Sequence, residues 1–199
     1  MNKRGIVIST IFETLTSGGI CVKGAPNPID IRKYLLYWDE IDYPTNNLIH
    51  IEGSPDIKFL EECKVLRRSN IRFIGSFLID GLIFLQTQQR AYEANEKNEK
   101  GCWDLAQLST TPYYVNSVQK QCLEFELFNC LPVPEHDVPL NDILEFKEKR
   151  RDELLELRVY LDELYQSIIT SEDPSKAINT ALTKIELSLN DIDRTLTES

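Results

Sequence analysis

The chain has 199 residues, of which 42% are hydrophobic and 27% charged, as is typical of a globular protein of one domain or slightly more. Its formal net charge of −10 and its isoelectric point near 4.8 exclude a general electrostatic footprint for nucleic acid or for an anionic membrane. We therefore expect neither direct nucleic-acid binding nor membrane binding.

The cysteine pattern and the lack of long apolar segments indicate the compartment. The 5 cysteines are odd in number, widely spaced and never arranged as C-x-x-C, which favours reduced thiols over a disulfide framework or a zinc site. The apolar run at the N-terminus is too short for a signal peptide, and the most apolar window, 77–85, is too short to span a bilayer. We expect a cytoplasmic protein without a cofactor.

The first part of the chain predicts a buried strand followed by a helix. The β-branched run Arg4–Ser9 is typical of a buried strand, and Ile20–Val22 is a candidate for a second, short strand. Asn27 followed by Pro28 is a helix start signal, and the apolar face that follows includes Trp38. This helix should end before Pro44.

The next segments repeat the order of strand and helix. Asn47–Gly53 is a predicted strand, Ser54 with Pro55 should open a helix, and Asn70–Gly75 is the third clear strand. Strands that alternate with helices through short joints predict right-handed βαβ units and a largely parallel sheet. A further helix should begin near Asp80, and its polar tail, 86–100, is either an exposed helix end or a loop.

The C-terminal third predicts two helices folded back on each other. A strictly alternating strand at Leu123–Leu127 precedes a proline-spaced linker. We therefore expect an α/β body at 1–131, a linker at 132–139 and a helical hairpin at 140–199. The fold class is α/β: a small, largely parallel sheet with flanking helices, then an antiparallel hairpin of coiled-coil type.

The hairpin prediction rests on apolar residues that recur every three and four positions. Such spacing draws one narrow stripe on a helix, as in a coiled-coil seam. The break between the helices carries Asp173 as N-cap and Pro174 as first helical residue, and a loop this short makes the helices antiparallel. The seam positions are Leu154, Leu157, Leu161, Leu164 and Ile168 on the first helix, and Ile178, Leu182, Ile185, Leu189, Ile192 and Leu196 on the second.

The hairpin has more apolar surface than its own seam covers. Burial of the seam alone does not offset the conformational entropy lost when two long helices become ordered. Either the N-terminal body or another chain must cover the rest, and the alternative to a docking arm is the outer layer of one compact domain. Candidate interaction residues are the off-seam apolar side chains and two nearby arginines: Ile143, Phe146, Arg150, Arg151, Leu155, Val159 and Ile169.

Several segments together resemble an uncharacterised bacterial family of unknown function. The resemblance implies a bacterial origin and an intracellular setting, and families of this sort often occur as accessory subunits in mobile or defence loci. It implies no catalytic residue. The segments are Arg4–Ile8, Tyr37-Trp38-Asp39, Leu131-Pro132-Val133-Pro134, Val138–Phe146 and Arg150–Leu154.

The best enzymatic alternative is an acidic site at the carboxyl end of the sheet. His50 and Glu52 alternate on one predicted strand, and Asp39 and Asp42 follow the preceding helix. The three carboxylates could bind a hard divalent cation, with His50 as a further catalytic candidate, as in a metal-dependent hydrolase or nuclease. A half-buried strand histidine beside a solvated acidic helix end explains the same pattern without catalysis.

The chain otherwise lacks catalytic signatures. It contains no Walker A loop, no G-x-G-x-x-G after the first strand and no G-x-S-x-G motif. The leading hypothesis is therefore a non-enzymatic interaction or accessory protein that uses its hairpin for self-association or for docking to a larger protein, for example in an anti-phage defence complex. The metal-dependent hydrolase or nuclease is the alternative.

Overall fold

The structure is a computed structural model that describes residues 3–14, 20–50, 52–75, 82–106 and 130–197. The chain divides into two compact units. The first comprises Met1–Tyr114 with Val133–Lys149, and the second comprises Val115–Pro132 with Arg150–Ser199.

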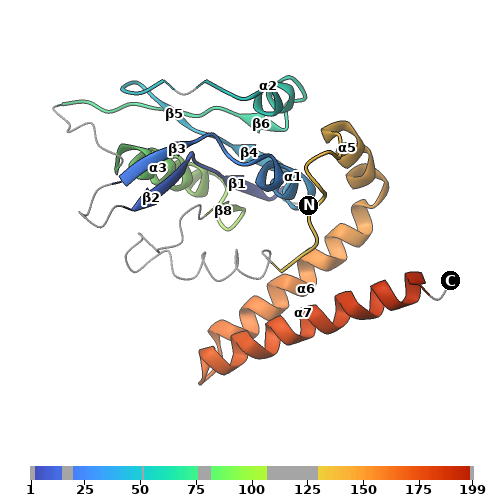
Figure 1. Ribbon diagram of the computed structural model, residues 1–199. Helices are drawn as coiled ribbons and strands as arrows, with labels where there is room; N and C mark the ends of the chain where they lie inside the picture. Colours follow the sequence, from blue (N-terminus) through green and yellow to red (C-terminus); the bar gives the residue numbers. More distant parts are fainter. Residues whose placement is uncertain (1–2, 15–19, 51, 76–81, 107–129, 198–199) are drawn as a thin grey trace. The chain divides into compact units, whose positions relative to one another are not determined.

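The first unit is built on a four-stranded parallel sheet in the order β6-β4-β1-β8. Its strands are β1 (Gly5–Val7), β4 (Glu40–Asp42), β6 (Leu66–Arg67) and β8 (Trp103–Leu105) (Figure 1). Every residue of β1 and β8 is buried, as expected for parallel strands covered on both faces. The predicted α/β class with a largely parallel sheet is confirmed.

Three helices connect these strands. They are α1 (Pro28–Tyr37), α2 (Pro55–Glu62) and α3 (Leu82–Asn98). Asn27 and Ser54 cap the first two helices by accepting hydrogen bonds from backbone N–H groups, and proline follows each cap, so both predicted helix starts are confirmed. The polar segment after Leu85 is helical as far as Asn98.

The order of the strands reverses beside β1. The chain runs from β1 outward to β4 and β6, and then returns through α3 to place β8 on the other side of β1. In open α/β sheets such a switch point opens a crevice beyond the carboxyl ends of the strands, where ligands bind. The strand order thus makes the carboxyl edge of this sheet the expected position of a ligand site.

Two smaller strand pairs lie outside this sheet. Strand β2 (Ile11–Thr14) pairs antiparallel with β3 (Ile20–Gly24), and β5 (Thr45–Asn46) pairs in parallel with β7 (Asn70–Ile71). The candidate strand at Ile20–Val22 therefore exists within β3.

The predicted strand at Asn47–Gly53 is wrong. Asn46 ends the extended chain, because its side-chain Oδ1 accepts hydrogen bonds from the backbone N–H groups of Leu48 and Ile49 at 2.9 and 2.8 Å. The sheet strand is instead the short β4, which immediately follows α1. The predicted strand Asn70–Gly75 is shortened to β7, while the predicted strand Leu123–Leu127 lies outside the described residues.

The C-terminal segment forms three helices: α5 (Leu140–Lys149), α6 (Arg151–Ile169) and α7 (Pro174–Thr197). The first predicted helix is interrupted at Arg150, whose backbone has φ −111° and ψ 28°. Helix α5 packs on α1 in the first unit, where Ile143 is buried and Lys147 Nζ donates hydrogen bonds to the carbonyls of Leu35 and Trp38. The division into units therefore differs from the predicted boundary at 132–139.

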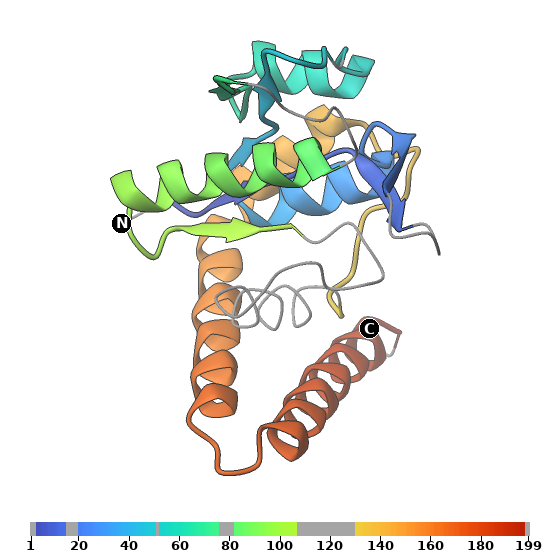
Figure 2. The ribbon, with the colours of Figure 1, turned by 90° about the vertical axis from the view of Figure 1, so that its left-hand side faces the viewer.

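Helices α6 and α7 belong to the second unit. The predicted cap is present, since Asp173 Oδ1 accepts a hydrogen bond from the N–H of Lys176 and Pro174 begins α7. The two helices meet near the connecting loop and diverge away from it (Figure 2). A coiled-coil seam along the pair is not confirmed, because Leu154 and Leu157 are only partly covered. Five side chains near the loop are buried: Leu161, Leu164, Ile168, Ala181 and Ile185.

Candidate functional site

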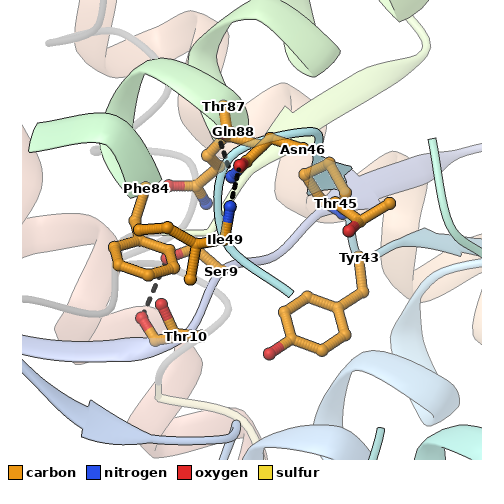
Figure 3. A pocket seen from close by; sticks show the side chains of 10 residues that line it. Ser9, Thr10, Tyr43, Thr45, Asn46, Ile49, Phe84, Thr87 and Gln88 are labelled. Carbon is orange, nitrogen blue, oxygen red and sulfur yellow. Dashed lines mark hydrogen bonds between the residues drawn. The ribbon is translucent and has the colours of Figure 1, made fainter. Parts of the chain in front are cut away.

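A pocket lies at the carboxyl edge of the parallel sheet (Figure 3). Its wall comes from the residues that follow β1, from the segment that follows β4, and from the first half of α3. The space that it encloses is about 10 Å³, enough for one water molecule. The lining residues are Ser9, Thr10, Tyr43, Pro44, Thr45, Asn46, Ile49, Phe84, Thr87 and Gln88.

Hydrogen bonds fix one wall of this pocket. Gln88 Nε2 donates to the carbonyl of Val7 at 3.1 Å and to that of Ala106 at 2.8 Å, and so connects the ends of β1 and β8 at the switch point. Thr87 Oγ1 donates to the carbonyl of Ile83 and accepts from Asn46 Nδ2 at 3.1 Å. These side chains hold α3 against the ends of the strands.

Two hydroxyl groups in the pocket have no hydrogen-bond partner among the described residues. They are Thr10 Oγ1 and Tyr43 Oη, whose residues are only 2% and 1% exposed. A buried polar atom without a partner costs about 1–3 kcal/mol. Burial raises the pKa of Tyr43, and the Arg68 guanidinium, 4.4 Å from the ring centroid, opposes the rise. The phenol is therefore neutral at pH 7.

Asp42 is a structural carboxylate. It is fully buried, and it accepts hydrogen bonds from Ser69 N at 3.1 Å, from Ser69 Oγ at 2.7 Å and from Asn95 Nδ2 at 2.8 Å. Arg67 Nε lies 3.6 Å from the same carboxylate. These contacts link the end of β4 to the segment after β6 and to α3. The carboxylate therefore stabilises the fold.

The other members of the predicted acidic site do not join Asp42. Asp39 precedes β4 and accepts a hydrogen bond from Arg4 N at 2.9 Å. His50 and Glu52 are exposed outside any strand, and Lys58, at 3.0 Å, lowers the pKa of Glu52. No group of three or more His, Cys, Asp or Glu side chains among the described residues is placed to bind a metal ion. The predicted cation site therefore does not form, because its strand does not.

The candidate interaction residues on α5 have different environments. Ile143 is buried against the first unit, so it cannot serve as a docking contact. Phe146 is 50% exposed.

The candidates at the start of α6 and along it remain accessible. Arg150 and Arg151 are exposed, and Arg150 Nη1 pairs with Glu153 Oε1 at 2.9 Å. Val159 is 50% exposed, and Leu155 and Ile169 are partly covered. These three apolar side chains lie on one side of α6, within an arc of about 80° at 3.6 residues per turn.

Helix α7 adds two features that the sequence analysis missed. Leu187, which lies off the predicted seam, is 59% exposed. Near the loop, α6 and α7 enclose a hollow of about 250 Å³. Apart from Leu164, small or polar side chains line it: Ser167, Ser171, Asp173, Lys176, Ala177, Thr180, Ala181 and Lys184.

These observations define a protein with a parallel α/β unit and a C-terminal helix pair that leaves apolar side chains exposed. Residues 8–199 match the model of the family of unknown function DUF6236, and the chain belongs to that family. This confirms the resemblance to an uncharacterised family. Comparison with curated proteins and with solved structures gives no match. Among the described helices, none has both the length and the apolar character needed to cross a bilayer.

Proposed function

We propose that this is a non-enzymatic interaction protein that self-associates through α6 and α7. The observation that carries the proposal is the exposure of Val159 and Leu187, two large apolar side chains on helices where further apolar residues, such as Leu155, are only partly covered. Burying one such side chain contributes about 1.5–3 kcal/mol. Association through this pair of helices would cover both.

Charge complementarity favours a second copy as the occupant. Helix α6 carries five acidic and two basic side chains, a net charge of −3. The hollow beside it presents Lys176 and Lys184 with a single acid, Asp173. The acidic α6 of one copy can therefore pack against the lysines of the other, and a twofold axis would repeat this contact.

The first experiment removes the apolar contacts. The double variant Val159→Asp/Leu187→Asp should weaken association strongly, because each change places a charge in a buried interface. The matched control Gln166→Asp/Thr183→Asp adds the same charge at exposed positions of the same helices. Sedimentation equilibrium measures the effect. Equal association by both variants would contradict the proposal.

A second experiment reverses the charges of the hollow. Lys176→Glu/Lys184→Glu should weaken association and make it less sensitive to salt, whereas Lys100→Glu in the first unit should leave it unchanged. If the apolar variant dissociates the protein but the charge reversal does not, the partner helix is not α6.

Cellular location and an alternative partner are also matters of proposal. We propose a cytoplasmic location, supported by Cys63 and Cys102, which form no disulfide. Docking to a larger protein, such as a subunit of an anti-phage complex, is the alternative to self-association. Conserved neighbouring genes of a defence locus would support it, and co-purification of such a subunit from the native cell would test it.

A further inference from the structure

We infer that the outer edge of β7, residues 70–74, binds an extended acidic segment of a partner protein, which adds a strand beside it. Strand addition of this kind combines main-chain hydrogen bonds, which give affinity, with side-chain contacts, which give specificity. The inference is independent of the proposed self-association, because the β7 edge lies in the first unit and α6 and α7 lie in the second.

The backbone of the β7 edge pairs on one side only. The carbonyl of Ser69 accepts a hydrogen bond from β5 at 2.8 Å, and Phe73 N donates to Asn47 Oδ1 at 2.8 Å. Since backbone groups alternate sides along a strand, those of Asn70 and Arg72 face away from β5. Among the described strands, none pairs with β7 on that side. The edge is therefore an open template for a further strand.

The side chains of the β7 edge alternate between α3 and solvent. Phe73 is buried, and the Arg90 guanidinium of α3 lies 4.4 Å from its ring centroid. Asn70, Arg72 and Ile74 occupy the alternate positions and are exposed, and Ile74 is 89% exposed. Side chains of an added strand would lie directly beside these three, as cross-strand neighbours do.

The local charge indicates the chemistry of the partner. Residues 63–75 contain four basic side chains and no acidic one, in a chain whose net charge is −10. Arg67 lies beside Asp42 and Arg68 lies on the Tyr43 ring, whereas Arg72 is exposed and forms no ion pair with a described residue. The fitting strand therefore places an acidic side chain opposite Arg72.

The same face defines a short pattern in the partner. Arg72 and Ile74 are two positions apart, so their side chains lie on one face of the edge. An added strand meets both when an acidic residue and an apolar residue are also two positions apart. The expected pattern is acidic-x-apolar, in either chain direction.

Two other occupants fit the edge less well. A second copy paired antiparallel about Asn70 or Arg72 would place arginine opposite arginine, and like charges directly opposite each other destabilise a strand pair. A nucleic acid would use the arginines through its phosphates but would leave the free backbone groups and Ile74 without partners. An acidic strand satisfies all three features.

The test uses a fluorescein-labelled peptide, Glu-Thr-Val-Thr-Glu-Thr-Val, with the full-length protein at low ionic strength. Fluorescence anisotropy should give a dissociation constant below about 1 mM, and added salt should weaken binding. Lysine in place of both glutamates should weaken binding at least about tenfold. Proline in place of the three threonines should do the same, because it removes backbone donors while it keeps the charge.

Variants of the protein locate the peptide. Arg72→Glu and Ile74→Asp should each weaken binding at least about tenfold. Asn70→Pro should also weaken it, because it removes an outward N–H without a change of charge, and proline is tolerated at such an edge position. Circular dichroism should show the wild-type spectrum for all three variants, since their side chains are exposed.

Controls in the second unit separate this inference from self-association. Arg151→Glu makes the same change of charge and should leave peptide binding unchanged, as should Val159→Asp/Leu187→Asp. Failure of the acidic peptide to bind, equal binding of the lysine or proline peptide, or unchanged binding by Arg72→Glu would overturn the inference. Tighter binding of single-stranded oligodeoxythymidine than of the acidic peptide would also overturn it, in favour of a nucleic acid.

Discussion

Replacing Asp42 by alanine tests whether this carboxylate supports the fold or serves a cation. The change removes the acceptor of three hydrogen bonds and leaves Ser69 N, Ser69 Oγ and Asn95 Nδ2 unpaired in a buried place. Removing one partner from a buried charged network costs about 3–5 kcal/mol. We expect Asp42→Ala to lower the free energy of unfolding by that amount.

Two milder substitutions provide a comparison for the loss of unfolding free energy in Asp42→Ala. Ser69→Ala removes only the hydroxyl donor and should cost about 1–2 kcal/mol, because the backbone N–H of residue 69 still reaches Asp42. The exposed Asp137→Ala is the matched control, with an expected effect below about 0.5 kcal/mol. Urea unfolding followed by circular dichroism measures all three variants.

The same assay separates the structural role from the metal-site alternative. We expect millimolar Mg²⁺ to leave the melting temperature of the wild type unchanged, because no described group of ligands is placed to bind it. A loss below about 1 kcal/mol in Asp42→Ala, together with stabilisation of the wild type by Mg²⁺, would refute the reasoning.

Three further predictions concern local features. Lys64 has φ 59°, so Lys64→Gly should raise the free energy of unfolding by up to about 1 kcal/mol in urea titrations, and a loss would contradict this. A Cβ added at Gly5 would lie 2.5 Å from the Trp103 ring, so Gly5→Ala should cost about 1–3 kcal/mol in the same assay; a neutral result would show that the ring can move. Burial raises the pKa of Tyr34 and Tyr37, so the folded state keeps both phenols protonated while the unfolded chain ionises them. Stability should therefore be complete below about pH 10 and fall above it, and melting curves from pH 8 to 12 that stay flat would contradict this.

Local signals were enough to predict where α1 and α2 begin. The pairs Asn27-Pro28 and Ser54-Pro55 act within one turn of chain, and both open helices in the structure. The apolar face of α1 also placed Trp38 in the core, where its Nε1 donates to Asp104 Oδ2 at 2.6 Å. Such features depend on neighbours in sequence.

The sheet strands depended on distant contacts instead. β4 has only three residues, two of them acidic, and it is a strand because β1 and β6 pair with it on either side. The alternating pattern around Ile49 looked more like a strand, yet the side chain of Asn46 turns the chain there. Thr10 and Tyr43 were missed for the same reason, since the order of the strands brings them together.

The break between α5 and α6 also had no local signal. Arg150 is neither proline nor glycine, and no side-chain hydrogen bond caps the helix that follows it. What holds α5 is tertiary: Lys147 bonds to carbonyls at the end of α1, and Arg32 Nε donates to the carbonyl of Val138 at 2.9 Å. A helical pattern in sequence does not record such contacts.

The most direct test of the central claim is the molar mass of the wild-type protein in solution. Light scattering over a concentration series should give a mass that rises toward twice the 23.0 kDa of one chain. The variant Val159→Asp/Leu187→Asp should stay at 23.0 kDa over the same series. A wild-type mass of 23.0 kDa at every concentration would contradict self-association through α6 and α7.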